Sequence, residues 1–198
     1  VLTAGPEHVA TGRDLNARLT VPVMINGGGP YHFVVDTGAE RTVISRELAD
    51  RLTLAPSKQV TLLTIGGSNL VDTAMVPDLK LTASRSRLVD LQAPVLSEAH
   101  LGAVGMLGID SLQRKRVILD FRAKRMTISE TPRSTATEAD EIVVIARRRY
   151  GQLILVDAEA DGQAINVVID TGSAVTIAND VLRRRLVQRG RLGPIIPI

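Results

Sequence analysis

The sequence predicts a mainly β protein built from two related but unequal copies of one pattern. The segment 31–39 recurs at 165–173, at an offset of 134 residues (170 − 36), and the match continues without gaps over roughly 35 positions. Each copy places apolar runs on both sides of a glycine turn, which is typical of two paired strands. Only 2% of the 198 residues are aromatic and none is Trp, so the core must consist of Val, Ile, Leu and Ala.

The first copy opens with two strands, expected over 19–25 and 31–35. The residues between them, Asn26-Gly27-Gly28-Gly29-Pro30, have strong turn chemistry. In the second copy, Asp161-Gly162 aligns with Gly27-Gly28 at the same turn. The sequence therefore predicts the same hairpin twice.

A short helix and further strands follow in the first copy. Ser45 is a suitable N-cap for a helix over 46–51, in which Leu48 shares one face with the neighbouring Leu52. Beyond it we expect two strands within 60–76 around Gly66-Gly67, short strand-like runs over 79–94, a helical stretch after Leu107-Gly108-Ile109-Asp110, and a hairpin of 117–121 with 125–128.

These elements suggest four parts of the chain. They are an N-terminal extension (1–17), a first lobe (18–130), a linker (131–141) and the opening half of a second lobe (142–198). The linker is rich in Thr, Ser, Ala and acidic residues, which is typical of a connecting segment. Within this sequence the second copy ends soon after its helix, so we expect a counterpart of residues 61–128 only where more chain follows in the natural protein.

The composition excludes several kinds of chemistry. Without cysteine there is no disulfide, zinc-thiolate site, iron–sulfur cluster or Cys nucleophile. The three histidines (His8, His32 and His100) are not paired at ligand spacing, so we expect no metal and no cofactor. A net charge of +3 without a basic patch argues against a nucleic-acid partner, and the apolar runs are too short to span a membrane.

The tripeptide Asp-Thr-Gly occurs at 36–38 and again at 170–172. One copy alone most often marks a turn whose Asp accepts a hydrogen bond from a backbone N–H. Two copies at matching points of a repeat, each after an apolar strand, are a much stronger signal. Two nearby carboxylates cannot both ionise cheaply, so such a pair shares one proton and can act as general base and general acid.

Four stretches together resemble the retropepsin-like aspartic proteases, and more closely the bacterial members than the large pepsins. They are Val34-Val35-Asp36-Thr37-Gly38-Ala39-Glu40-Arg41-Thr42-Val43, Ile65-Gly66-Gly67, Met106-Leu107-Gly108-Ile109-Asp110 and Val117-Ile118-Leu119-Asp120-Phe121. The resemblance implies an acid-protease barrel lobe with a linked, incomplete second related lobe.

The resemblance also implies a role for individual residues. Asp36 and Asp170 would be the catalytic pair, Thr37, Gly38, Thr171 and Gly172 would support the two loops, and Ile65, Gly66 and Gly67 would form a flap over the substrate. Leu107-Gly108 would lie beside the catalytic loop and help to complete it. Ser173 replaces Ala39 in the second loop, and a hydroxyl there is expected to donate to Asp170 and to weaken its hold on the proton.

We therefore expect an aspartic endopeptidase that cleaves extended peptide or protein segments with apolar residues around the scissile bond. Two arrangements remain open, a dyad of Asp36 and Asp170 in one chain or a homodimer in which Asp36 meets its symmetry mate. A non-catalytic peptide-binding module on the same fold is the alternative function. The family resemblance and the absent initial Met suggest the periplasm or cell envelope, and a cytoplasmic location stays open.

Overall fold

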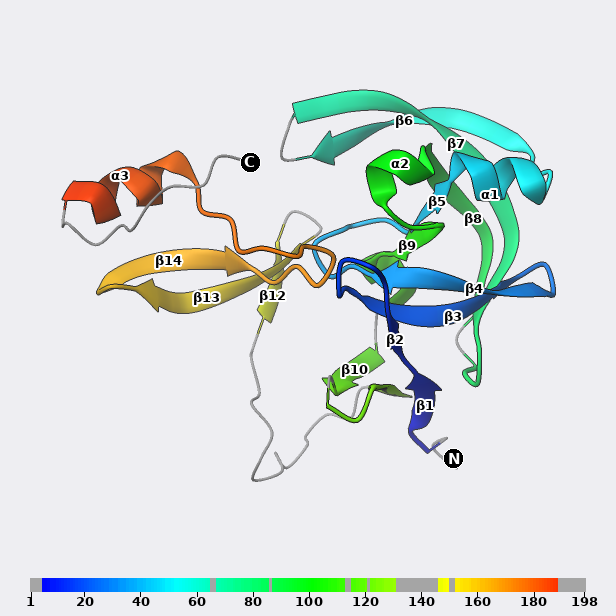
Figure 1. Ribbon diagram of the computed structural model, residues 1–198, viewed down its shortest axis with the longest axis horizontal. Coiled ribbons are helices and arrows are strands. Elements are labelled where there is room, and N and C mark those ends of the chain that lie inside the picture. Colours follow the sequence, from blue (N-terminus) through cyan, green and yellow to red (C-terminus); the bar gives the residue numbers. More distant parts are fainter. Residues whose placement is uncertain are drawn as a thin grey trace.

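A hairpin of two strands, β3 (Leu19–Ile25) and β4 (Gly28–Val35), lies at the centre of the first lobe (Figure 1). The computed structural model describes residues 5–64, 67–85, 87–112, 115–120, 122–130, 146–149 and 152–188. Asn26 and Gly27 alone make the turn, with φ of 50° and 79°, as a type I′ turn requires. The second strand therefore begins at Gly28, three residues before the predicted start.

The hairpin belongs to an eight-stranded sheet with the order β2-β3-β4-β9-β5-β8-β7-β6. An additional pairing of β3 with β7 closes the sheet on itself, so the lobe is barrel-like. The other strands are β2 (Gly12–Arg13), β5 (Val43–Ser45), β6 (Pro56–Thr64), β7 (Gly67–Leu81), β8 (Arg87–Leu96) and β9 (Gly105–Leu107).

The prediction of short runs over 79–94 was wrong, because β7 and β8 are long, continuous strands. Pro77 interrupts the apolar alternation of the sequence and provides no backbone N–H. The ladder nevertheless continues on both sides of it, with Val76 opposite Leu91 and Asp78 opposite Val89.

The helices are short and each has a local cause. Helix α1 (Arg46–Arg51) is confirmed with its cap, because the Ser45 Oγ accepts a hydrogen bond from the Leu48 N–H at 3.1 Å. The fully buried Leu48 anchors this helix to the lobe. Helix α2 (Glu98–Leu101) was not predicted, and a 3-10 turn, η1 (Ile109–Leu112), forms where the sequence predicted a helical stretch.

A separate three-stranded sheet joins the two ends of the first lobe. Strand β1 (Glu7–Ala10) pairs with β11 (Arg125–Glu130), and β11 pairs with β10 (Lys115–Asp120), as the predicted hairpin requires. Phe121 and the predicted linker 131–141 lie outside the described residues.

The core of the first lobe is aliphatic apart from one ring. Phe33 is fully buried among Val, Ile, Leu and Ala side chains. Its ring occupies the space where a side chain of residue 105 would lie, since a Cβ on Gly105 would be 2.4 Å from ring carbons. Among the described residues, the core is therefore filled mainly by aliphatic side chains and Met126 around the Phe33 ring, with the partly buried Tyr31 packed against it.

The second copy forms a smaller unit beside the first lobe (Figure 1). Its sheet has the order β12-β13-β14, with β12 (Ala146–Arg149), β13 (Gln152–Ala160) and β14 (Gln163–Val168), followed by helix α3 (Asp180–Gln188). Asp161 and Gly162 make a second type I′ turn, with φ of 48° and 73°. This turn matches Asn26-Gly27 rather than Gly27-Gly28, so the predicted alignment was one residue out of step at the turn.

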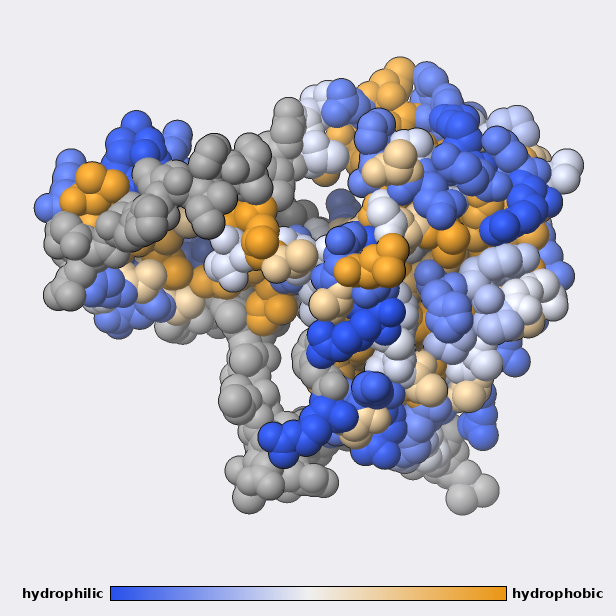
Figure 2. Space-filling model, in the orientation of Figure 1, coloured by the Kyte–Doolittle hydropathy of each residue, from blue (hydrophilic) through white to orange (hydrophobic). Residues whose placement is uncertain are grey.

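The second copy buries little apolar surface. Figure 2 shows apolar residues on the face of this unit beside the polar side chains of α3, which contains no buried residue. Several large apolar side chains are exposed here, namely Val168, Val175, Ile177, Val181 and Val187. Two repeat counterparts in the first lobe, Val34 of Val168 and Val43 of Ile177, are buried.

The described residues confirm the mainly β fold class. The boundaries of the four predicted parts, and the assignment of 142–198 as half of a second lobe, stay predictions.

Replacing Gly105 by alanine should destabilise the protein by about 1–3 kcal/mol, because the new methyl group would overlap the buried Phe33 ring. Urea unfolding measures the change in the free energy of unfolding. Gly5→Ala is the matched control, since nothing lies within 4 Å of a Cβ at Gly5. Equal unfolding midpoints for the two variants would contradict the packing described for Phe33.

Candidate active site

The two Asp-Thr-Gly loops meet where the first lobe faces the smaller unit (Figure 1). Asp36 directly follows β4, and Asp170 comes two residues after the end of β14. The structure therefore brings together two tripeptides that are 134 residues apart in one chain. Strand pairing provides this placement, because each loop leaves the same end of its hairpin.

Thr37 and Thr171 join the loops symmetrically through hydrogen bonds to each other and to the residue before each aspartate. The Thr37 hydroxyl donates to the Ile169 carbonyl at 2.7 Å, and the Thr171 hydroxyl donates to the Val35 carbonyl at 2.6 Å. Each hydroxyl also accepts the backbone N–H of the opposite threonine, at 3.2 Å in both directions. Each hydroxyl thus donates one hydrogen bond and accepts another across the contact. These bonds fix the separation of the two aspartates.

Glycine is required after each threonine because the opposite carboxyl group occupies the space of a side chain. A Cβ on Gly38 would lie 2.7 Å from the Asp170 carboxyl carbon, and a Cβ on Gly172 would lie 2.5 Å from that of Asp36. Real Cβ contacts are essentially never this short. The supporting glycines are needed for space, and neither takes a positive φ.

Backbone N–H groups hold one oxygen of each carboxyl group. The Asp36 Oδ1 accepts hydrogen bonds from Gly38 N–H at 2.9 Å and Ala39 N–H at 3.0 Å. The Asp170 Oδ1 accepts the equivalent bonds from Gly172 at 2.8 Å and Ser173 at 3.0 Å. Each carboxyl group also lies against the glycine of the opposite loop, so the two carboxyl groups are close enough to share a hydrogen bond.

Burial of Asp36 raises the pKa of its carboxyl group from 3.8 to about 6. The negative charge of Asp170 and the hydrogen bond between the two carboxyl groups act in the same direction, while the N–H donors of Gly38 and Ala39 oppose the rise. Asp36 is 9% exposed, whereas Asp170 is exposed. The pair therefore combines a desolvated carboxyl group with a hydrated one.

The expected role of Ser173 was wrong. Its hydroxyl donates to the Val175 carbonyl at 2.7 Å and accepts the Val175 N–H at 3.3 Å, so it turns back on its own loop. Only the backbone N–H of Ser173 reaches Asp170. The asymmetry of the pair arises from the unequal burial of the two aspartates instead.

The segment 107–111 lies along the first loop, as the sequence analysis expected for Leu107-Gly108. Asp36 N–H donates to the Leu107 carbonyl at 3.0 Å, and a Cβ on Gly108 would be 2.4 Å from the Arg41 carbonyl carbon. The link between Asp110 and Thr42 was not predicted from the sequence. The Thr42 hydroxyl donates to the Asp110 carboxylate at 2.6 Å. Thr42 and Asp110 are 68 residues apart, so no periodicity in the sequence links them. The only available signal was that both lie in the stretches that resemble the protease family.

Of the predicted flap, Gly67 is described, at the start of β7, while Ile65 and Gly66 lie outside the described residues. Gly67 has a φ of 124°, which favours glycine, and nothing lies within 4 Å of the position of a Cβ. Leu63 and Leu70, near the end of the same hairpin, are 82% and 65% exposed. This hairpin presents two large apolar side chains to solvent.

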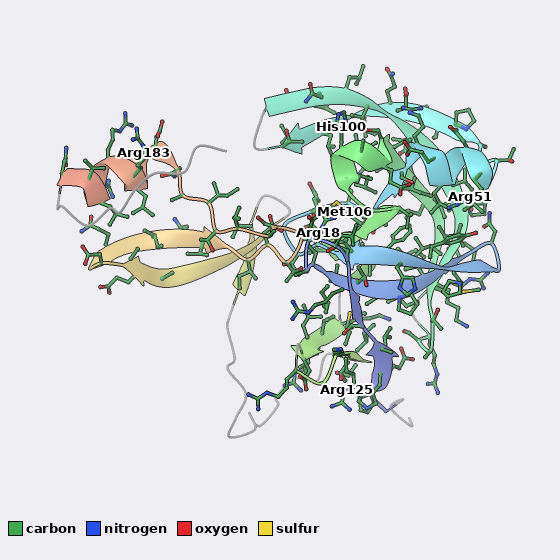
Figure 3. All side chains as sticks on the ribbon, in the orientation of Figure 1. Arg18, Arg51, His100, Met106, Arg125 and Arg183 are labelled. Carbon is green, nitrogen blue, oxygen red and sulfur yellow. The ribbon has the colours of Figure 1, made fainter. Side chains whose placement is uncertain are left out.

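The remaining predicted features are placed as follows. Arg183, Arg184 and Arg185 are exposed on α3, which agrees with the prediction of a solvated face, and Arg183 lies far from Arg51 of the first lobe (Figure 3). Within the described ranges, no group of three or more His, Asp or Glu side chains could hold a metal ion. No helix among those residues is long and apolar enough to cross a membrane.

Two hollows of the first lobe lie away from the aspartates. One, of about 570 Å³, lies beside α2 and is lined by residues that include Arg13, His32, Glu98 and Val104. The other, of about 340 Å³, lies beside β8 and is lined in part by Glu40, Arg41 and Asp110. Neither includes a residue of an Asp-Thr-Gly motif.

One comparison with known protein families includes the first aspartate of this site. Residues 21–111, just under half of the chain, match the family model described as aspartyl protease. The match confirms the resemblance drawn from the motifs, and it includes Asp36 but ends before Asp170.

Among solved structures, a crystal structure of a retropepsin-like aspartic protease from Rickettsia conorii is similar to 64% of this chain and 91% of its own chain. The two sequences are 20% identical in that comparison, and the TM-score is 0.46. The search of curated proteins found no match.

Replacing Asp36 by asparagine should stabilise the fold at pH 7.5 by up to about 3 kcal/mol and leave it unchanged below about pH 4. A raised pKa of about 6 means that the folded state favours neutral Asp36, so the native protein loses this stability as the pH rises from 3.8 through about 6. Asparagine stays neutral, keeps an oxygen for the N–H groups of Gly38 and Ala39, and can donate to Asp170.

Urea unfolding at the two pH values, with the exposed Asp50→Asn as control, measures this difference. An Asp36→Asn variant that is less stable than the native protein at pH 7.5 would contradict the raised pKa.

Proposed function

We propose that this chain is an aspartic endopeptidase in which Asp36 and Asp170 activate a water molecule between them. The carrying observation is the contact of the two Asp-Thr-Gly loops, which brings two carboxyl groups into a shared hydrogen bond. The aspartyl protease family match over 21–111 supports the same class of reaction.

The chemistry of such a pair follows from its single shared proton. The charged carboxylate removes a proton from the water as it attacks the scissile carbonyl carbon. The protonated carboxyl group donates to the carbonyl oxygen, which leaves a neutral tetrahedral intermediate. The proton taken from the water then passes to the leaving nitrogen as the C–N bond breaks, and the other carboxylate takes a proton from a hydroxyl of the intermediate. The pair thereby returns to its starting state with one shared proton.

The unequal burial favours one assignment of these roles. Burial disfavours a charge on Asp36, so the proton lies preferentially on Asp36 and the charge on the exposed Asp170. In this arrangement Asp170 is the base that accepts the proton of the water, and Asp36 is the acid. The titration itself belongs to the pair.

The end of the β6–β7 hairpin supports a class of substrate. An extended peptide can add to the lobe as a strand, where backbone groups supply affinity and alternate side chains supply selectivity. The exposed Leu63 and Leu70 near the end of that hairpin favour apolar side chains on the substrate. We therefore propose peptide or protein substrates with apolar residues near the cleaved bond.

One observation favours a second candidate, a peptide-binding module without catalytic activity. Asp170 is exposed, and the apolar residues around it on the second copy, such as Val168 and Val175, are exposed as well. A site that is open to water on one side stabilises developing charge less well than a dry one. Binding would need the hairpin and the loops but not the shared proton.

Replacing either Asp36 or Asp170 by asparagine should lower kcat/KM by at least about 100-fold, because each variant removes one partner of the acid–base pair. In the native protein kcat/KM should fall as the pH rises above about 6, where the pair loses its shared proton. Cleavage of a peptide library between about pH 3 and 8, followed by mass spectrometry, measures both effects. Asp50→Asn, an exposed carboxyl on α1, is the matched control.

The outcomes separate the alternatives. Full activity of Asp170→Asn, together with a dimer in sedimentation analysis, would show that Asp36 acts with its symmetry mate. No cleavage by a folded protein that still binds an apolar peptide would favour the binding module. Binding of a peptide with a statine-type hydroxyl group that is lost in Asp36→Asn would count against that module.

A further inference from the structure

The first catalytic loop is held along its whole length by the segment 107–111. At its start, Asp36 N–H donates to the Leu107 carbonyl at 3.0 Å, and in its middle the Ala39 carbonyl accepts the Ile109 N–H at 3.0 Å. At its end, Thr42 is bound by Asp110. The first two contacts are made by backbone and would form with many sequences, whereas the third depends on one side chain.

Asp110 holds Thr42 through three close donor–acceptor contacts. Its Oδ1 and Oδ2 lie 3.0 Å and 2.9 Å from the Thr42 nitrogen, and its Oδ1 accepts the Thr42 hydroxyl at 2.6 Å. The charge-assisted bond from the hydroxyl is in the short, strong range. Thr42 is almost completely buried, so water cannot replace these bonds.

Thr42 in turn holds Gly108, which is adjacent to the residue that binds the Asp36 backbone. Its Oγ1 accepts the Gly108 N–H at 3.1 Å, and Gly108 is packed so tightly on Arg41 that no side chain fits there. The Gly108 carbonyl in turn accepts the Ser111 hydroxyl at 2.6 Å. Hydrogen bonds therefore link Asp110 through Thr42 to Gly108, which is the residue next to Leu107, the acceptor of Asp36 N–H.

We propose that Asp110 is a positioning residue, which holds Asp36 at the correct separation from Asp170 by fixing the end of the first loop through Thr42. The expected effect on kcat rests on the proposed function, whereas the positioning of Asp36 by Asp110 does not. Asp110 neither touches the aspartates nor reaches the junction of the loops, and its effect is transmitted through Thr42 and Gly108.

The second copy provides an internal comparison. Thr176 occupies the repeat position of Thr42, but it is exposed, and no described residue binds it as Asp110 binds Thr42. The carboxyl group of the second loop, Asp170, is also the exposed one. The first loop, whose end is bound by Asp110, is thus the loop that contains the buried aspartate, Asp36.

The test compares variants that remove or keep the acceptor at position 110. Asp110→Ala should lower kcat about 10- to 100-fold with KM changed less than about 3-fold, because misplacement of a reacting group acts on the chemical step. Asp110→Asn should keep most of kcat, because its amide oxygen still accepts from Thr42. Thr42→Val should resemble Asp110→Ala, the double variant should be no worse than either single variant, and the exposed Thr176→Val should leave kcat unchanged.

A second readout does not depend on activity. The amide signals of Gly38 and Ala39, whose N–H groups donate to Asp36, should shift in the NMR spectra of Asp110→Ala and Thr42→Val and stay in place in Asp110→Asn and Thr176→Val. The same spectra show whether each variant is folded. If Asp110→Ala does not fold, Thr42→Val carries the test, since it preserves shape and removes only the hydroxyl.

The results distinguish the two ideas. An unchanged kcat and unchanged Gly38 and Ala39 signals in a folded Asp110→Ala variant would overturn the positioning role and leave the proposed function intact. Shifted signals in a protein whose native form cleaves nothing would support the positioning role and count against the peptidase. A loss of stability with kcat per folded molecule unchanged would show a merely structural role and would also overturn the proposal.

Discussion

The two threonine hydroxyls that cross between the loops determine the geometry of the whole site. Each hydroxyl donates to the carbonyl that precedes the opposite aspartate and accepts the N–H of the opposite threonine. Neither Thr37 nor Thr171 can turn away without leaving polar groups of the other loop unpaired, at a cost of about 1–3 kcal/mol for each buried group. The close approach of the carboxyl groups, the raised pKa of Asp36 and the need for glycine at 38 and 172 all follow from this contact.

The parts of the molecule that were predictable from sequence are those specified by neighbouring residues. The hairpin of β3 and β4 follows from apolar runs around a turn, and helix α1 follows from its Ser45 cap. The pairing of the two loops was predictable because the repeat marks equal positions in both copies. The repeat therefore favours Asp36 and Asp170 as a pair, although the sequence left a homodimer pairing of Asp36 open and the catalytic role stays a prediction.

What could not be predicted depends on partners that are distant in sequence. Strands β5 and β9 have three residues each and are strands only because long strands lie beside them. The bond from Thr42 to Asp110 joins positions without a shared pattern. The error at Ser173 has a related cause, because the sequence shows that a hydroxyl is present but not that the Val175 backbone competes for it.

The turns of the two hairpins show where the repeat is constrained and where it is free. At the loop end the registers are the same, with Thr20 opposite Val34 in one copy and Ile154 opposite Val168 in the other. At the turn end the copies are one residue out of step, and a β-bulge in each hairpin absorbs the difference. In each hairpin, therefore, the strand register is the same at the loop end and differs between the copies at the turn end. The turn can therefore sit one residue earlier or later while the pairing beside the aspartates stays the same.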